Sequence, residues 1–270
     1  MWCLNPDCGF LDQAEPKRHG VGPWACPACS KETYENALEA SLTSGATATT
    51  TATVTLSVSI SVWSAWARIA IRAARQAAKA RNKYDSAPPG RGADFVGLEF
   101  ESGLTAIAAV AFALDGFYAC EAVPQAARNA AVSSLTTQAN PNPDRHEKVR
   151  EALKLCFVVN GATAQTWSKE IKWVYSRRNP IVHSKDEWET PIEMPDGALS
   201  TVKRQNYNAE AAARAVDAML GVLTYCVAHP GTAYPQTATW ADPNRRAGID
   251  NLDRWWRTPG WHPFDGMDDT

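Results

Sequence analysis

The chain has 270 residues, of which 45% are apolar and 21% are charged, and its formal net charge is −2 at pH 7. Its length suits one sizeable domain with a small one beside it, and its composition is that of an ordinary globular protein. Because the net charge is slightly negative, the protein cannot bind nucleic acid through its overall charge. A nucleic-acid surface would therefore have to be a local patch.

The N-terminus lacks a basic region followed by an apolar run, so it does not read as a secretion signal. The apolar run at residues 104–114 is too short to span a bilayer. We therefore expect a cytoplasmic protein with no membrane partner.

Two cysteine pairs lie within the first 29 residues, formed by Cys3, Cys8, Cys26 and Cys29. Thiolates suit tetrahedral Zn²⁺, and each pair can hold the ion from one side. Disulfides are the alternative, but they are disfavoured in the cytosol. The pattern resembles a zinc ribbon, in which a structural zinc would contribute on the order of 10 kcal/mol to folding. Four thiolates leave no open coordination position, which argues against a catalytic zinc.

The segment after the cysteines contains one strand pattern and one helix pattern. We predict a short helix at 31–40 and a linker or weak strand at 41–52. Apolar residues alternate with Thr and Ser over 53–62, which indicates a half-buried strand that would pair with 44–52 or with a second chain. Residues 63–83 have helical composition, and a basic stripe recurs on that helix at Arg68, Arg72, Arg75 and Lys79. The stripe could contact phosphates, or it could be an ordinary solvated face.

The remainder of the chain reads as a series of helices. An apolar helix is expected at 94–118 with two acids, Glu101 and Asp115, followed by helices at 144–159, 163–178 and 209–228. His146 falls in a first turn beside charged residues, where we expect it to be exposed. Residues 184–207 suggest a loop or small hairpin. The tail at 230–270 suggests a segment that packs through individual aromatic anchors.

The string Arg178-Asn179-Pro180-Ile181-Val182-His183 carries the functional prediction. Arg178 continues an apolar stripe at helical spacing, so its guanidinium should face the bundle interior or a groove, where it needs an anionic or polar partner. Pro180 disfavours helical geometry at the residue before it, so we expect a break at Asn179 that turns His183 back toward Arg178. The alternative is an Asn-Pro helix cap with His183 bonded to a backbone carbonyl.

An imidazole and a guanidinium that converge can cleave RNA without a metal. The imidazole can take a proton from a ribose 2′-hydroxyl near neutral pH, and the guanidinium binds phosphate oxygens and stabilises the charge that develops on them. The expected products are a 2′,3′-cyclic phosphate and a free 5′-hydroxyl.

The string resembles the Arg-x4–6-His motif of HEPN domains, with Asn179 at the polar position after the arginine. The resemblance covers about residues 94–228 and implies a helical bundle that acts as an RNA-cleaving homodimer. It also implies a toxin or antiphage effector with an antitoxin or defence-system partner. The implied catalytic residues are Arg178, Asn179 and His183. Glu101 and Asp115 could pair with Arg178, orient His183 or form ordinary salt bridges.

The predicted fold class is mainly α, with a HEPN-like helical bundle preceded by a small four-cysteine zinc ribbon and a short β segment. The predicted organisation is a ribbon at 1–32, a linker with short β strands and the basic helix at 33–92, the bundle at 93–230 and a Pro/Trp-rich tail at 231–270. The alternative function is a non-catalytic module that binds nucleic acid or protein through the ribbon and the basic helix.

Overall fold

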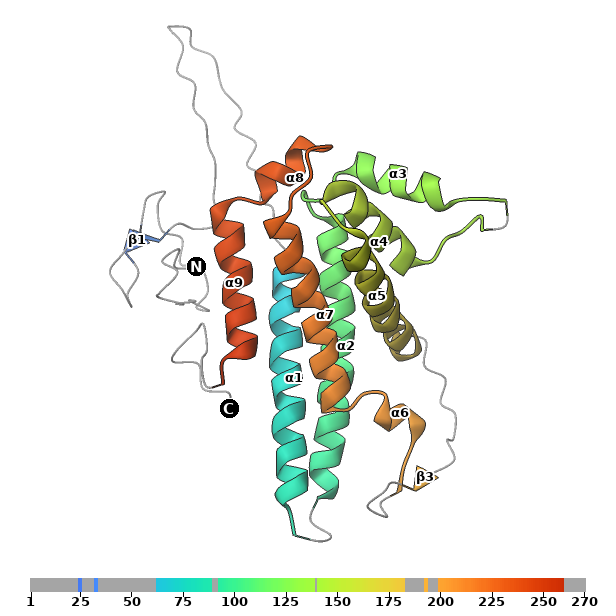
Figure 1. Ribbon diagram of the computed structural model, residues 1–270. Helices are drawn as coiled ribbons and strands as arrows, with labels where there is room; N and C mark the ends of the chain where they lie inside the picture. Colours follow the sequence, from blue (N-terminus) through green and yellow to red (C-terminus); the bar gives the residue numbers. More distant parts are fainter. Residues whose placement is uncertain are drawn as a thin grey trace, which may run out of the picture. The chain divides into compact units, whose positions relative to one another are not determined.

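The computed structural model describes residues 24–25, 32–33, 62–88, 92–138, 140–182, 192–193 and 199–259. The chain divides into two compact units, Ser61–Asp253 and a second made of Met1–Ile60 with Arg254–Thr270. The described part is mainly α-helical (Figure 1). Its helices are α1 Val62–Ser86, α2 Ala93–Ala119, α3 Gln125–Leu135, α4 Arg145–Cys156, α5 Gly161–Val182, α6 Val202–Gln205, α7 Ala209–Ala228, α8 Pro235–Trp240 and α9 Pro243–Arg257.

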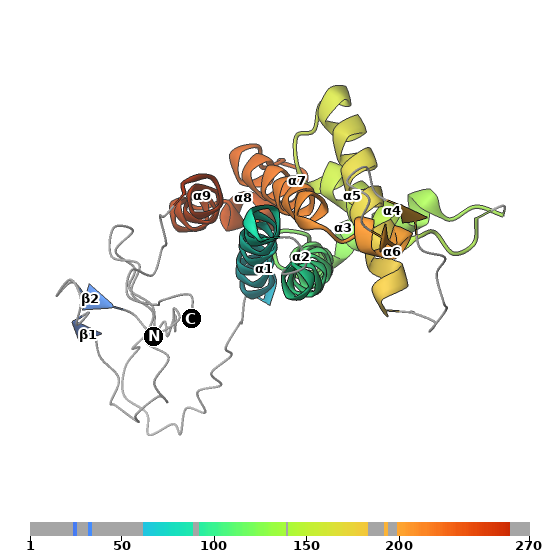
Figure 2. The same cartoon turned by 90° about the horizontal axis from the view of Figure 1, so that it is seen from below.

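The unit Ser61–Asp253 is built on three long helices, α1, α2 and α7, which lie side by side (Figures 1 and 2). Small side chains let the helices approach closely, because fully buried alanines line α1 at Ala67, Ala70 and Ala77 and α2 at Ala106. Helix α5 packs against α2, α4 and α7, and α3 packs against α4. The basic helix therefore belongs to the bundle, which extends beyond the predicted limits of 93–230 at both ends.

An aromatic cluster joins α1, α2 and the chain after α7. The ring of Trp240 lies 5.1 Å from that of Phe117 and 6.5 Å from that of Trp63, measured between ring centres. Phe157 stacks on Phe117 at 6.1 Å. Trp240 is therefore the kind of aromatic anchor that the sequence predicts for the tail. The tail also forms α8 and α9, about which the sequence made no prediction.

The helices at the end of the chain begin at prolines. Pro235 and Pro243 occupy the first positions of α8 and α9. Proline is well suited to this position because its missing N–H would have no partner there. Neither these two helices nor α3, which follows Pro124 directly, were predicted from the sequence.

Two short antiparallel strand pairs, with an isolated bridge between Phe157 and Pro230, account for the described β structure. Strand β1, Trp24–Ala25, pairs with β2, Glu32–Thr33, so the short helix predicted at 31–40 is wrong at these two residues. Strand β3, Ile192–Glu193, pairs with β4, Leu199–Ser200, which confirms the hairpin alternative for 184–207. Of the strand predicted at 53–62, Val62 instead begins α1 and the rest lies outside the described residues.

Two helices are long and apolar enough to cross a membrane by length and composition, Asp94–Ala119 and Ala209–Ala228. The uninterrupted apolar stretch at 104–114 is shorter than the apolar helix that contains it, so its length did not indicate either segment. Both belong to the bundle, where α2 and α7 pack against one another, and 44% and 50% of their apolar windows are buried. Core helices of bundles have the same composition, so these features give only weak support for a membrane span.

Candidate functional site

Helix α5 carries the arginine of the predicted motif and continues through Pro180 to Val182. The break expected at Asn179 is therefore wrong. Pro180 lacks the N–H that would bond the carbonyl of Ser176, and its position two residues before the end of α5 confines the disturbance to the last turns of the helix. The hydroxyl of Tyr207 also donates to the carbonyl of Arg177 at 2.8 Å, which secures this turn from outside. His183 lies outside the described residues.

Arg178 occupies the inward position that its sequence spacing predicts. The preceding stripe residues Trp167, Ile171 and Val174 are all buried. The Arg178 guanidinium lies over the ring of Phe112 at 5.5 Å, and Phe112 in turn packs on Trp66 of α1 with ring centres 4.9 Å apart. The sequence did not indicate this stack, because its members come from α1, α2 and α5.

The guanidinium of Arg178 makes few polar contacts within the described part of the chain. Its Nη1 is 3.5 Å from Oδ1 of Asn179, at the outer limit of a hydrogen bond. Its Nε is buried and has no hydrogen-bond partner among the described residues. No described carboxylate forms an ion pair with it. Arg178 is therefore a half-buried cation whose charge no described acid neutralises.

Asp115, one of the two candidate acids, bonds to residues other than those of the motif. Its Oδ1 accepts hydrogen bonds from Arg145 Nε at 2.6 Å and from the Tyr175 hydroxyl at 2.7 Å. The Arg145 guanidinium also lies over the ring of Tyr118 at 4.3 Å. Asp115 thus joins α2, α4 and α5, and its charge is balanced by Arg145 rather than by Arg178.

Glu101, the other candidate acid, is exposed on α2, and its side chain has no described partner. The buried acid of this helix is instead Glu99, with 6% of its surface exposed. An oxygen of Glu99 accepts the backbone N–H of Ala209 at 2.9 Å, in the first turn of α7. Glu99 therefore anchors the start of α7, where a carboxylate is favoured by the helix dipole.

The cluster shifts the pKa values of its own members. Burial raises the pKa of Tyr175 well above its ordinary value, and Asp115 adds to this, while Arg145 and Arg178 act in the opposite direction. Tyr175 is therefore a neutral hydrogen-bond donor at physiological pH. Burial opposes the charge of Arg145, but its hydrogen bond to Asp115 and the carboxylate charge outweigh this and raise its pKa.

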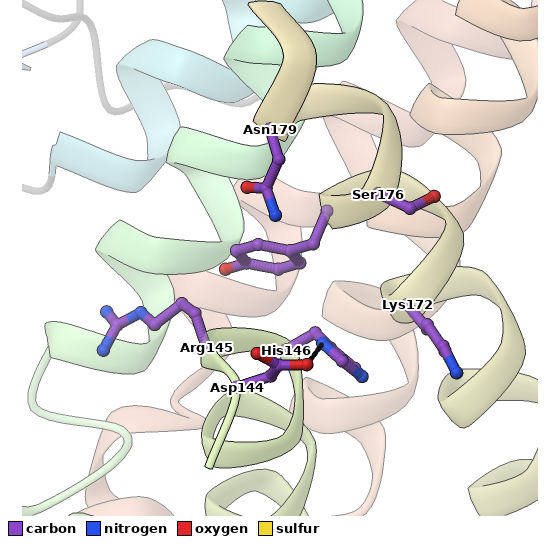
Figure 3. Close-up of a pocket in the computed structure, with 7 residues that line it drawn as sticks. Asp144, Arg145, His146, Lys172, Ser176 and Asn179 are labelled. Atoms are coloured by element: carbon purple, nitrogen blue, oxygen red, sulfur yellow. Dashed lines mark ion pairs between the residues drawn. The ribbon is translucent and has the colours of Figure 1, made fainter. Parts of the chain in front are cut away.

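A cavity of about 170 Å³ opens beside this cluster, between the start of α4 and the second half of α5 (Figure 3). Its walls are formed by Asp144, Arg145, His146, Lys172, Tyr175, Ser176 and Asn179. The side chain of Arg145 extends away from Lys172 (Figure 3). The cavity therefore reaches the predicted motif at Asn179.

His146 is a cavity residue that the sequence prediction placed in solvent. Its side chain is only 15% exposed, and its Nδ1 lies 3.8 Å from a carboxylate oxygen of Asp144. Burial lowers the pKa of His146; Asp144 and Glu147 counteract this, while Lys172 and Arg150 lower it further. A sequence signal existed, because His146 precedes the buried Val149 by three residues and so borders the inward stripe of α4.

The predicted basic stripe on α1 is only partly exposed and does not line this cavity. Arg72 and Lys79 are exposed, whereas Arg68 and Arg75 are half-buried. Burial, with Arg72 nearby, lowers the pKa of Arg68 to about 10. The four residues therefore do not form a uniformly solvated row.

The predicted zinc ligands Cys3, Cys8, Cys26 and Cys29 lie outside the described residues. The paired strands β1 and β2 flank in sequence the segment that carries Cys26 and Cys29. Within the described ranges, no group of three or more His, Cys, Asp or Glu side chains could hold a metal ion. Of the three remaining cysteines, Cys156 and Cys226 are buried, while Cys120 is partly exposed.

The chain was compared with protein families, curated proteins and solved structures. No family model matches the sequence, and no curated protein or solved structure matches the chain.

Proposed function

We propose that this protein is a metal-independent endoribonuclease that acts through Arg178, Asn179 and His183. One observation carries the proposal: the Arg178 guanidinium is half-buried, its Nε has no described hydrogen-bond partner, and no described carboxylate neutralises it. Burying an uncompensated cation is costly, and an anionic ligand would remove that cost. Asp115, which was a candidate partner for Arg178, already binds Arg145 and Tyr175.

Each motif residue would have a separate role in cleavage. Arg178 would bind the phosphate oxygens and stabilise the charge that builds up on them. Asn179 would orient the phosphate or the adjacent ribose through its amide. His183, which follows α5 in the sequence, would take the proton from the 2′-hydroxyl, whose oxygen attacks the adjacent phosphorus while the P–O5′ bond breaks and the leaving 5′-oxygen takes a proton from water. The products would be a 2′,3′-cyclic phosphate and a 5′-hydroxyl.

The resemblance to HEPN domains supports further parts of the proposal. In that superfamily two motifs meet across a dimer, so a chain with one motif would act as a homodimer. It would be a toxin or antiphage effector controlled by an antitoxin or another defence component. The N-terminal cysteines would hold a structural zinc, and the ribbon would contribute to recognition of RNA or of that partner.

The test is cleavage of mixed RNA by wild-type, Arg178→Ala and His183→Ala proteins in the presence of EDTA, after circular dichroism has shown equal helical content. Arg177→Ala is the matched control, because the neighbouring guanidinium lies over Trp173 at 5.8 Å instead of over Phe112. Wild type and Arg177→Ala should both cut RNA and leave cyclic phosphate ends, and the two motif variants should lose at least about a hundredfold in rate.

Cleavage that persists in purified His183→Ala would contradict the mechanism. Wild-type protein that binds RNA but leaves it intact would favour the non-catalytic binding module. In that case, neutralising Arg72 and Lys79, the exposed members of the basic stripe, should weaken binding most at low salt.

A further inference from the structure

We propose that the cavity between α4 and α5 binds a phosphate group of the RNA chain, adjacent to the phosphate held by Arg178, with Lys172 and His146 as its principal ligands. Figure 3 shows both side chains at one end of the cavity and Asn179 at the other. The assignment of this phosphate to RNA rests on the proposed function. Anion binding by the cavity itself does not.

The first argument concerns which polar groups of the cavity wall are still available. Tyr175 donates its hydroxyl proton to Asp115, and Ser176 donates its own to the carbonyl of Trp173 at 2.7 Å. Neither can therefore donate to a ligand without losing a bond. Lys172 and the side-chain amide of Asn179 have no such commitment among the described residues, and His146 Nε2 makes no hydrogen bond to a described group. The Lys172 ammonium and the Asn179 Nδ2 group are thus available donors, and His146 Nε2 becomes a donor when the imidazole is protonated.

The second argument concerns charge. Lys172 is exposed and forms no ion pair with a described acid. The carboxylate of the wall, Asp144, takes part in a capping box with Glu147 at the start of α4 and lies on the Nδ1 side of His146. This placement favours a proton on Nδ1 and supports the imidazolium when an anion approaches from the other side. A phosphodiester offers several acceptor oxygens, so it can satisfy an ammonium, an imidazolium and an amide together.

The third argument is continuity with the motif. Asn179 belongs to the cavity wall and also contacts Arg178, whose Nη1 is 3.5 Å from its Oδ1. An RNA chain with one phosphate at Arg178 would therefore pass Asn179 and reach the cavity with a neighbouring phosphate. The cavity would fix the register of the strand relative to Arg178.

Binding in this cavity should depend on pH. The groups that face His146 are Asp144 and Glu147 from α4, with Arg150 from α4 and Lys172 from α5 as opposing cations. Burial lowers the pKa of His146 in the free protein, so its imidazole is neutral at pH 7.5. A bound phosphate favours the imidazolium. Affinity should therefore increase as the pH falls through the pKa of His146.

The experiment uses the full chain, inorganic phosphate and a 2′-O-methyl RNA oligonucleotide, which cannot be cleaved because the attacking hydroxyl is blocked. Imidazole resonances are followed by NMR, and His146→Gln identifies the signal of His146. Both ligands should shift that signal. Lys172→Gln should weaken binding of the oligonucleotide about tenfold and reduce the slope of log affinity against log salt by about 0.7, the value for one phosphate contact on a single strand. Lys169→Gln, an exposed lysine on α5 outside the cavity wall, is the matched control and should bind like wild type.

Unchanged oligonucleotide affinity and salt slope in Lys172→Gln would overturn the proposal. Shifts of the His146 signal by inorganic phosphate but not by the oligonucleotide would show a site for free phosphate and overturn the assignment to RNA. Failure of the proposed function would look different: the oligonucleotide would shift the His146 signal, while unmodified RNA would remain intact in the same buffer.

Discussion

The hydroxyl of Tyr175 donates a 2.7 Å hydrogen bond to Oδ1 of Asp115, 60 positions earlier in the sequence. This bond connects α5 to α2 beside the arginine of the motif. Because Arg145 Nε donates to the same oxygen, the start of α4 is held in the same cluster. The wall of the cavity and the helix that carries Arg178 are therefore positioned by one carboxylate.

Replacing that carboxylate should destabilise the bundle. Asp115→Asn removes the charge that balances Arg145 and weakens the acceptor of Tyr175, so the free energy of unfolding should fall by about 1–2 kcal/mol in urea denaturation. Glu101→Gln is the matched control on the same helix, because that side chain is exposed and has no described partner. Its effect should stay within about 0.5 kcal/mol. Equal effects of the two substitutions would contradict the assigned role of Asp115.

Tyr175→Phe should flatten the alkaline limb of the stability profile. Burial and Asp115 raise the pKa of Tyr175 in the folded state, whereas an unfolded tyrosine ionises near pH 10. Above that pH the unfolded state binds fewer protons than the folded state, so stability falls as pH rises, by up to about 1.4 kcal/mol per pH unit for one group. The difference in unfolding free energy between wild type and Tyr175→Phe, measured at pH 8 and at pH 11, should shrink at the higher pH. A constant difference would argue against a buried, un-ionised phenol.

Two glycines of α2 should respond in opposite directions to alanine. A Cβ on Gly103 would overlap the backbone carbonyl of Tyr207 and lie 2.7 Å from its carbon, so Gly103→Ala must displace the turn whose tyrosine holds the end of α5. We expect a loss of about 2–4 kcal/mol in unfolding free energy. Gly97 has open space around a Cβ, and Gly97→Ala should gain about 0.5–1 kcal/mol through helix propensity. Thermal unfolding followed by circular dichroism measures both, and stabilisation by Gly103→Ala would contradict this packing.

His146→Gln should reduce the loss of stability in mild acid. Burial lowers the pKa of His146 in the folded state, so below about pH 6.5 the unfolded state binds a proton that the folded state does not. The contribution of His146 to stability is therefore present above that pH and is lost as the pH falls. The unfolding free energy of His146→Gln minus that of wild type, measured by urea denaturation, should be larger at pH 5 than at pH 7.5. An equal difference in stability between the two proteins at both pH values would point away from burial as the cause.

The N-terminal cysteines should bind zinc. Protein purified from zinc-containing medium should carry the metal in a stoichiometric amount by elemental analysis, and Cys26→Ser should lose it because a thiolate ligand is missing. Cys226→Ser removes a fully buried thiol of α7 and should keep the metal. Zinc retained by Cys26→Ser, or lost equally from both variants, would contradict the ribbon prediction.

Local sequence was sufficient to predict most of the bundle. The helices that became α1, α2, α4, α5 and α7 follow from apolar spacing at the helical period, which is a property of neighbouring residues. The same spacing placed Arg178 on the inward face of α5. The helices missed are α3, α6, α8 and α9. Helices α3, α6 and α8 are short, and α9 starts at a proline although its own apolar spacing is helical.

The partners in the candidate site could not be read from the sequence. Asp115 was a candidate from its place on an apolar helix, but its pairing with Arg145 and Tyr175 depends on which helices are neighbours. That His146 lines the cavity also depends on which helices are neighbours, because the cavity lies between α4 and α5.

The sequence by itself determined the helical periodicity, the cysteine pairs and the inward direction of Arg178, because each depends on spacing along a single segment. Only the tertiary structure decided that Arg178 lacks a described carboxylate and that Pro180 is accommodated within α5. The physical reason is that charge pairing and the support of a helix end are set by groups distant in sequence. Here those groups are Asp115, which is occupied by other partners, and Tyr207, whose hydroxyl bonds the carbonyl of Arg177 in the last turn.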